Sequence, residues 1–165
     1  MPHEHFYNAR MVWTGGRHGA TASYDSYSRE YTAVCEGKPE LVGTADPAFR
    51  GDATKHNPED LLLISLSACH LLSYLAECAR VGISVIDYED QAQGKLAIKD
   101  GKMRFVEVVL KPRVVVAQGT DLARARALHE RAHAGCFIAN SVSFPVTNEP
   151  VIIEEGAEGA VEEML

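Results

Sequence analysis

The sequence predicts an α+β fold in which antiparallel sheet lies on one side of two helices. Two stretches, 57–80 and 122–139, have helical apolar patterns, and strand-like stretches precede, separate and follow them. The order of three strands, a helix, two strands, a helix and a strand is typical of this class. A chain of 165 residues is long enough for one domain with a real core, so we expect a single domain over 1–165.

The N-terminal third is predicted to consist of strands and loops. Strands are expected at 6–13, 20–27 and 29–35, with a glycine-rich turn at 14–19. The proline- and glycine-containing segment 37–55 is expected to be a long connection. Because loops of that length are usually functional, its Arg50 is a candidate site residue. Residues 1–5 and 155–165 are predicted to be mobile ends.

Residues 57–80 are predicted to form the central helix. Asn57 suits the N-cap and Pro58 the first helical position, and Glu59 adds negative charge to the first turn. Apolar residues cover most of the circumference, which indicates a buried helix. Polar side chains make it a poor membrane span; they are Ser65, Ser67, His70, Ser73 and Glu77.

The second half is predicted to contain a hairpin, a helix and a last strand. Strands at 83–98 and 103–116 flank an Asp100-Gly101 turn. A helix over 122–139 is capped by Thr120 or Asp121 and presents one core-facing stripe; its members are Ala125, Leu128, Ala132 and Cys136. A strand at 144–153 precedes an acidic tail.

The composition bears on possible partners, on cellular location and on the role of the cysteines. The net charge of −7 argues against nucleic acid and against an anionic membrane surface as partners. No signal peptide or long apolar span is evident, so a cytoplasmic location is expected. Four cysteines in such a chain are not a disulfide scaffold, and any that matter should matter as thiols.

Cys69 and Cys136 are the two thiols of interest, because both lie on predicted helices beside a small residue. They could form a reversible disulfide if the helices pack side by side. The alternative is inert packing, the usual fate of a buried cysteine and our expectation for Cys35 and Cys78.

A reactive Cys69 needs a neighbouring cation to hold it as a thiolate. It lies about three turns into its helix, beyond the reach of the helix dipole. Arg50 and Arg17, both on glycine-containing loops, are the candidate cations, and Glu59 is the candidate carboxylate to hold one of them. All three could instead be ordinary solvated charges.

Two motifs resemble those of the OsmC/Ohr family, the osmotically inducible protein C and organic hydroperoxide resistance proteins. The first is Asn57-Pro58-Glu59-Asp60-Leu61-Leu62 followed by Ser67-Ala68-Cys69-His70. The second is Ala132-His133-Ala134-Gly135-Cys136. The likeness spans nearly the whole chain. It implies an OsmC-like fold with antiparallel sheets around two central helices, in an intertwined homodimer.

The resemblance implies a cofactor-free thiol peroxidase with an antioxidant role in oxidative stress. Cys69 would attack an organic hydroperoxide and become a sulfenic acid, Cys136 would condense with it to a disulfide, and a dithiol would reduce that disulfide. Glu59 matches the family's glutamate. Arg50 resembles the arginine of the OsmC branch and Arg17 that of the Ohr branch. Phe137 stands where the family usually has proline.

Helix geometry gives a separate reason to expect a dimer. Glu59 and Cys69 are about 15 Å apart along a straight helix, so they cannot share one site within one chain. A second copy could supply the missing partner. The expected surroundings of Cys69 (Leu66, Leu72 and Phe137) are apolar and favour an alkyl hydroperoxide over hydrogen peroxide.

Two other functions remain open. His129-Glu130-x-x-His133 matches the zinc-hydrolase pattern H-E-x-x-H, with Glu130 as general base. No third ligand is evident, and the predicted core stripe leaves both histidines to one side. The other possibility is a member of the fold that binds a ligand without turnover.

Overall fold

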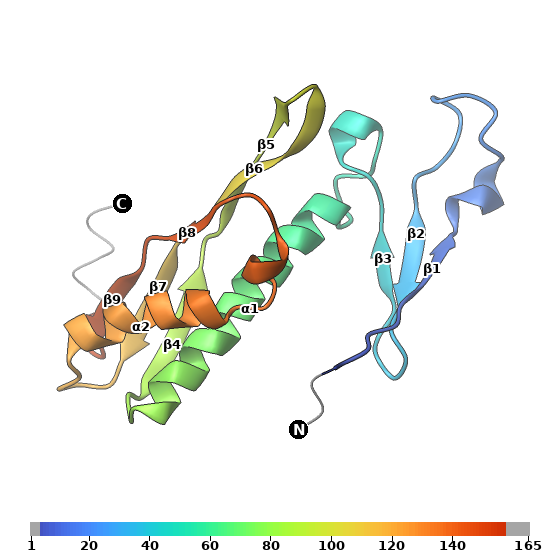
Figure 1. Cartoon of the computed structure of the whole chain (residues 1–165). Coiled ribbons are helices and arrows are strands. Elements are labelled where there is room, and N and C mark those ends of the chain that lie inside the picture. Colours follow the sequence, from blue (N-terminus) through green and yellow to red (C-terminus); the bar gives the residue numbers. More distant parts are fainter. Residues whose placement is uncertain (1–3, 158–165) are drawn as a thin grey trace. The chain divides into compact units, whose positions relative to one another are not determined.

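Two α-helices and three small sheets make up the computed structural model, which describes residues 4–157 (Figure 1). The predicted α+β class is confirmed. The chain divides into two compact units, one ending at Leu62 and the other beginning at Leu63. Of the ends predicted to be mobile, residues 1–3 and 158–165 lie outside the described residues.

The first unit contains one antiparallel sheet of three short strands. In order across the sheet they are β1 (Arg10–Trp13), β2 (Tyr31–Val34) and β3 (Leu41–Gly43). The strand predicted at 20–27 is wrong, since this segment forms turns and bends. The Arg29 guanidinium donates to the carbonyl oxygens of Tyr24 and Tyr27 and lies over both rings, which draws the segment into a loop. The connection predicted at 37–55 is also interrupted, because it contains β3 and a short 3-10 turn, Pro47–Phe49.

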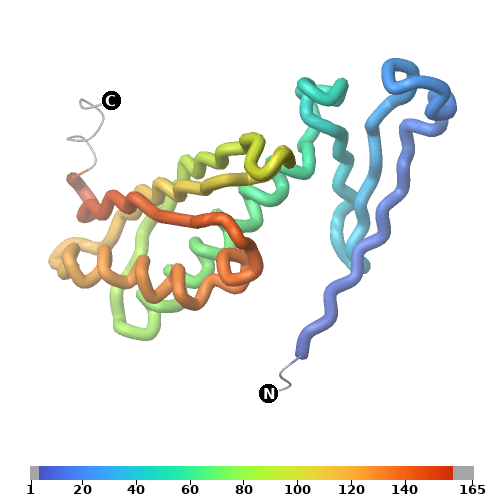
Figure 2. The backbone as a smooth tube through the Cα atoms, turned by 45° about the horizontal axis from the view of Figure 1, so that its top comes forward, coloured from blue at the N-terminus to red at the C-terminus, as the bar shows by residue number. Residues whose placement is uncertain are grey.

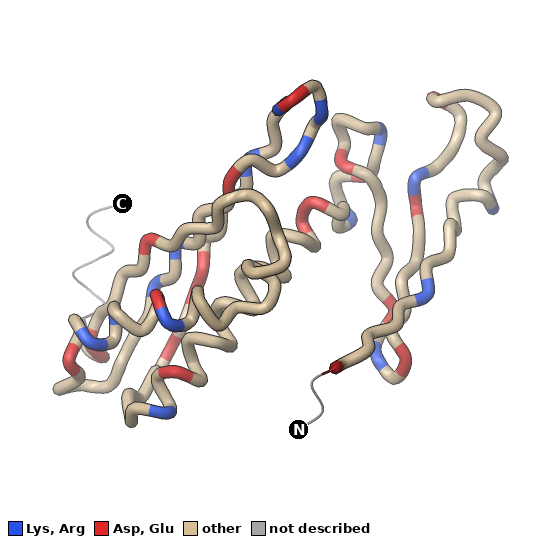
Figure 3. Tube along the Cα trace, in the orientation of Figure 1, with Lys and Arg blue, Asp and Glu red and all other residues tan. Residues whose placement is uncertain are grey.

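The central helix α1 (Pro58–Arg80) has the predicted bounds and cap. The Asn57 side chain accepts a hydrogen bond from the backbone N–H of Asp60 (2.7 Å), and the Asp60 carboxylate accepts one from the N–H of Asn57 (3.2 Å). This reciprocal pair satisfies two donors that a helix start leaves open. Figure 3 shows charged residues only towards the two ends of α1. By length and composition α1 could cross a membrane, a weak indication because core helices of soluble proteins also meet that test.

The second unit contains two three-stranded sheets. One consists of β4 (Val85–Asp90), β7 (Pro112–Val116) and β9 (Val151–Glu154); the other of β5 (Gln93–Lys99), β6 (Lys102–Leu110) and β8 (Val146–Asn148). The hairpin turn between β5 and β6 is confirmed, with both Asp100 and Gly101 at positive φ. Besides antiparallel pairs there are two parallel ones, β6 with β8 and β7 with β9.

The predicted long strands are each divided in two. The breaks fall at Gln91 and Lys111, where the Asp90 carboxylate accepts a hydrogen bond from the Lys111 N–H (2.7 Å) and Pro112 follows directly. The Asp90 side chain therefore accepts from a backbone N–H that would otherwise bond to a neighbouring strand. The last predicted strand is divided likewise at Glu149 and Pro150, and its second half extends to Glu154, which was assigned to the tail.

The helix α2 (Leu122–Gly135) runs alongside α1 (Figures 1 and 2). Its N-cap is Asp121, whose carboxylate accepts from the Arg124 N–H (3.0 Å). It ends four residues before the predicted Ala139. Side chains of α1, α2 and the β4-β7-β9 sheet form the buried core; they include Tyr74, Cys78, Val114, Val116, Ala125, Leu128, Ala132 and Ile152.

Candidate active site

The two thiols singled out from the sequence lie against each other. Cys69 is half-buried in the middle of α1, and Cys136 is buried directly after α2. Both are free thiols, and the Cys69 side chain is close enough to act on the pKa of the Cys136 thiol. Burial, and then the contact with Cys69, raises the pKa of the Cys136 thiol to about 11. At neutral pH Cys136 therefore holds its proton and can donate it towards the Cys69 sulfur.

Cys136 is held by the end of α2 rather than by the helix body. Its backbone is extended (φ −76°, ψ 109°), and its N–H donates to the carbonyl oxygen of His133 (3.1 Å). The N–H of Ala139 donates to its sulfur (3.4 Å), while the Asn140 side chain caps the Ala134 carbonyl (3.0 Å). The prediction that Cys136 lies within a helix is wrong, but its place on the buried stripe is confirmed.

A groove of about 520 Å³ opens beside Cys69, between α1 and the end of α2. Most of its lining is apolar, from Ala68, Leu72, Ala76, Gly135 and Phe137, while Ser65 and Ser73, one turn before and after Cys69, add polar groups. Its far end is charged, since Glu77 pairs with Arg80 and with Arg131 (2.7 Å). Leu72 and Phe137 are thus where they were expected, whereas Leu66 is fully buried and does not line the groove.

A buried pair of histidines joins α1 to α2 next to the thiols. His70 Nε2 and His129 Nδ1 are 2.9 Å apart, and each side chain is only 1% exposed. The His129 ring also stacks on Tyr74, with centroids 3.8 Å apart. Burial is the main cause that lowers the pKa of His70 to about 4 and that of His129 to about 3, so both rings are neutral at pH 7.

The histidine pair corrects the zinc alternative. His129 was expected to lie beside the core stripe. It is buried instead, because Ala125 and Ala132 are small and the buried face of α2 is wider than one stripe. It uses one ring nitrogen on His70, while Glu130 is exposed. Within residues 4–157 no three potential metal-ligating side chains come together, so the residues present do not fit the zinc site that H-E-x-x-H suggested.

The candidate arginines and Glu59 belong to the first unit. Arg50 has a positive φ of 64° at the end of the Pro47–Phe49 turn, and its Nε pairs with Asp25 Oδ1 at 2.8 Å. The carboxylate that holds it is therefore Asp25 rather than Glu59. Arg17 is exposed on the Gly15–His18 turn. Glu59 is half-buried and, after burial itself, contributes to raising the pKa of Tyr31.

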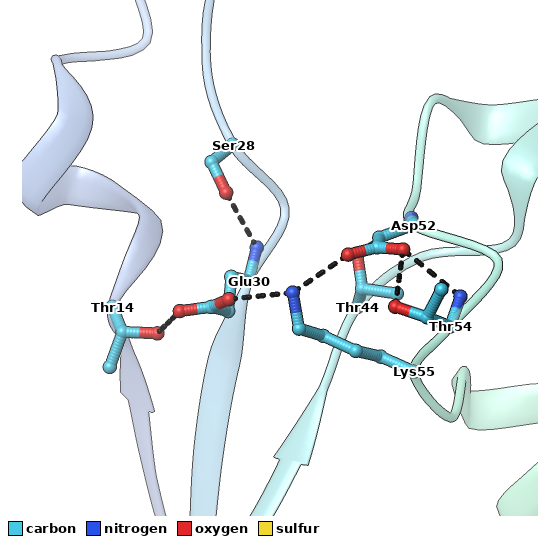
Figure 4. A network of polar contacts seen from close by, with 7 residues as sticks. All are labelled: Thr14, Ser28, Glu30, Thr44, Asp52, Thr54 and Lys55. Carbon is cyan, nitrogen blue, oxygen red and sulfur yellow. Dashed lines mark hydrogen bonds and ion pairs between the residues drawn. The ribbon is translucent and has the colours of Figure 1, made fainter.

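A polar network that the sequence did not reveal supports the Arg50 loop (Figure 4). The Lys55 ammonium bridges Glu30 of the first sheet (2.9 Å) and Asp52 of the loop (2.8 Å). These contacts lower the pKa of both carboxyl groups. Glycine is needed at position 51 because the backbones of Ala45 and Gly51 pack closely. A Cβ at Gly51 would lie 1.5 Å from the Ala45 carbonyl oxygen. The loop that presents Arg50 is thus held by charge and by close backbone packing.

Comparison with known proteins identifies the family. Residues 51–150 match the family model described as OsmC-like protein. The chain belongs to the OsmC-like family. The matched residues include Glu59, Cys69 and Cys136 and begin directly after Arg50.

Similar proteins support the same OsmC-like fold. An OsmC-like protein of unknown function from Vibrio cholerae O1 biovar eltor is 30% identical, with a TM-score of 0.83 over 90% of this chain and 100% of that one. An organic hydroperoxide resistance protein from Elizabethkingia anophelis has a TM-score of 0.67 at 19% identity, over 94% and 100% of the two chains; at that identity the likeness concerns the fold. The uncharacterized protein YmaD of Bacillus subtilis (strain 168) is 25% identical over 52% of this chain and 59% of its own length. That match therefore spans less than two thirds of YmaD.

Two features of this OsmC-like site had no clear sequence signal. The histidine pair joins residues 59 positions apart, and its only trace in the sequence was the pattern that suggested zinc. The Glu77–Arg131 pair also joins the two helices. Both require knowledge of how α1 and α2 pack, which periodicity alone does not provide.

Proposed function

We propose that the protein is a thiol-dependent peroxidase that reduces organic hydroperoxides through Cys69 and Cys136. The observation that carries the proposal is the proximity of the two free thiols where the end of α2 meets the middle of α1. Two free thiols in contact, one beside an apolar groove and one buried, are suited to a disulfide-forming cycle. Membership of the OsmC-like family, and a fold shared with an organic hydroperoxide resistance protein, support a peroxide-related redox role.

In the first step the Cys69 thiolate attacks the terminal oxygen of the hydroperoxide. An S–O bond forms, the O–O bond breaks, and the alkoxide leaves as the alcohol after taking up a proton. Cys69 is then a sulfenic acid. The mostly apolar lining of the groove supports a substrate with an alkyl or aryl group, because such a group gains more from burial than hydrogen peroxide does.

In the second step the sulfur of Cys136 attacks the sulfur of the sulfenic acid. The S–S bond forms, the S–O bond breaks, and the leaving hydroxide combines with the thiol proton of Cys136 to give water. The neutral state of Cys136 keeps that proton available at the site. An external dithiol then reduces the disulfide and is itself oxidised to a disulfide.

The proposal assigns thiolate stabilisation to an arginine from the first unit, Arg50 in preference to Arg17. Arg50 lies on a supported loop and keeps an unusual backbone conformation, as residues at functional sites often do. Glu59 is proposed as the carboxylate that holds this arginine at the site. It lies in the first turn of α1, which is continuous as far as Arg80.

We also propose that the site is completed in a homodimer. Large apolar side chains of α1 and of the loop after α2 are exposed, among them Leu72 (66%) and Phe137 (81%). Exposed apolar groups beside a reactive thiol indicate a surface that is covered in the working protein. The axial distance of about 15 Å between Glu59 and Cys69 supports a site that takes these residues from different chains.

Mass spectrometry after one equivalent of cumene hydroperoxide tests the chemistry. We expect the protein to lose the mass of two hydrogen atoms, the two protons and two electrons given up in disulfide formation, and to yield a peptide linking Cys69 to Cys136. Cys69→Ser abolishes the reaction, whereas Cys136→Ser stops at the sulfenic acid, which dimedone traps. Cys35→Ser is the matched control and forms the same link. Reaction without a Cys69–Cys136 link in the unaltered protein contradicts the proposal.

A further inference from the structure

Three neighbouring pairs of residues join α1 to α2 and the residue that follows it. In order along α1 they are Cys69 to Cys136, His70 to His129 (2.9 Å), and Tyr74 Oη to the carbonyl oxygen of Ala125 (3.2 Å). Residue numbers rise along α1 as they fall along α2, so the helices are antiparallel. The thiol contact is therefore the end member of a row that passes through the buried histidines.

His129 and Cys136 occupy the same side of α2. They are seven residues apart, which is two turns of an α-helix within about 20°. Cys136 follows the last helical residue, and its N–H bond to His133 ties it to that turn. A rotation of α2 that breaks the histidine bond therefore also carries the Cys136 sulfur sideways, away from Cys69.

Stability alone does not explain why two histidines, rather than two apolar residues, occupy these positions. It makes one hydrogen bond and leaves two buried nitrogens, His70 Nδ1 and His129 Nε2, without a partner among residues 4–157. Whichever ring donates, one N–H and one lone pair remain unsatisfied. Two apolar side chains of similar size would fill the same space without that cost. A hydrogen bond differs from an apolar contact in having a direction, and so it can specify one rotation of α2.

We infer that the bond between His70 and His129 is a positioning contact that fixes α2 against α1 and so holds Cys136 over Cys69. The two histidines do not touch the reacting atoms. Their contribution rests on the proposed cycle, in which the second step requires the two sulfurs to meet. They set how rapidly the sulfenic acid is converted to the disulfide.

Disulfide equilibrium in glutathione redox buffers tests the inference without any hydroperoxide. Oxidised glutathione supplies the oxidising equivalents, and two molecules of reduced glutathione are released per disulfide formed. The double variant His70→Leu/His129→Leu should lower the effective concentration of the Cys69–Cys136 pair about tenfold or more, because small misplacements of reacting groups have large effects. His129→Asn should stay near the unaltered protein, since its side-chain amide can still bond to His70. His133→Leu is the matched control and should change nothing.

Urea unfolding of the same variants separates positioning from general stability. The double variant should be at least as stable as the unaltered protein although its disulfide closes less readily. An unchanged effective concentration overturns the inference. So does a loss that is matched by an equal fall in unfolding free energy, because the pair is then merely structural.

A parallel assay with an alkyl hydroperoxide and dimedone links the inference to the cycle. The double variant should accumulate several-fold more dimedone-labelled Cys69 than the unaltered protein does. If the unaltered protein does not react with the hydroperoxide but the glutathione result holds, the peroxidase proposal fails and the positioning contact stands. A hydroperoxide-reactive protein whose double variant gives no excess label contradicts the inference alone.

Discussion

Among single residues, a few hold an unusual backbone conformation. Arg50 is the clearest case, since its positive φ is a conformation that residues with a Cβ seldom adopt. Its ion pair with Asp25 is exposed on both sides and contributes little to stability. Neither feature contributes much to the stability of the loop, which is consistent with the proposed role of Arg50 at Cys69.

Arg50→Gly should separate activity from folding. Glycine adopts the φ of 64° without strain, so the unfolding free energy should stay within about 1 kcal/mol. Peroxidase activity should fall about a hundredfold if the guanidinium stabilises the thiolate. Asp100→Gly relieves a similar backbone conformation (φ 53°) in the β5–β6 turn and should leave activity unchanged. Peroxide assays and urea titrations of both variants decide the outcome, and full activity in Arg50→Gly refutes the assignment.

At the scale of elements, sequence reasoning succeeded where a local rule was sufficient. The bounds of α1 follow from Asn57, Pro58 and the apolar run, and the β5–β6 turn follows from Asp100-Gly101. It failed where distant contacts decide. The alternating pattern of residues did not predict that the Lys111 N–H would donate to the Asp90 carboxylate, or that both long strands would be interrupted near this bond. The cysteines were found from their motifs, but the facing histidines were not, because their pairing depends on helix packing.

The contact between α1 and α2 should weaken in acid. The pKa values of His70 and His129 fall from 6.5 in an unfolded chain to about 4 and about 3. The unfolded chain therefore binds more protons below pH 6.5, and stability is lost progressively as the pH falls from about 6.5 to about 3, where the folded rings also become protonated. The loss should reach a few kcal/mol. The unfolding free energies of the unaltered protein and of His70→Leu/His129→Leu, measured in urea at a series of pH values, should diverge below pH 6.5. If both fall equally with pH, the burial of the histidine pair is contradicted.

At the scale of the whole molecule, the described residues leave much apolar surface uncovered. The core cluster lies wholly in the second unit, while the first unit exposes Met11 (62%) and Trp13 (44%) on its small sheet. A three-stranded sheet needs a packed face for stability. A second copy of the chain can cover such surfaces symmetrically.

Mixing two inactive variants should test whether the site is shared. Cys69→Ser and Glu59→Gln are each expected to lack activity as homodimers. If one site takes its cysteine from one chain and its glutamate from the other, exchange of subunits restores activity, up to about a quarter of the unaltered level in an equal mixture. Analytical ultracentrifugation should show a dimer in all samples. A fully active monomer would exclude the shared site.

The parallel pairing of β7 with β9 has a consequence for how an oxidised protein is regenerated. Because these neighbouring strands run in the same direction, the intervening chain with α2 forms a bridge anchored to one sheet at both ends. Cys136 lies on that bridge, so its sulfur is restrained from both directions along the chain. In the proposed cycle a reductant would reach the sulfurs through the groove beside Phe137, and the shape of that groove would select electron donors as well as peroxides.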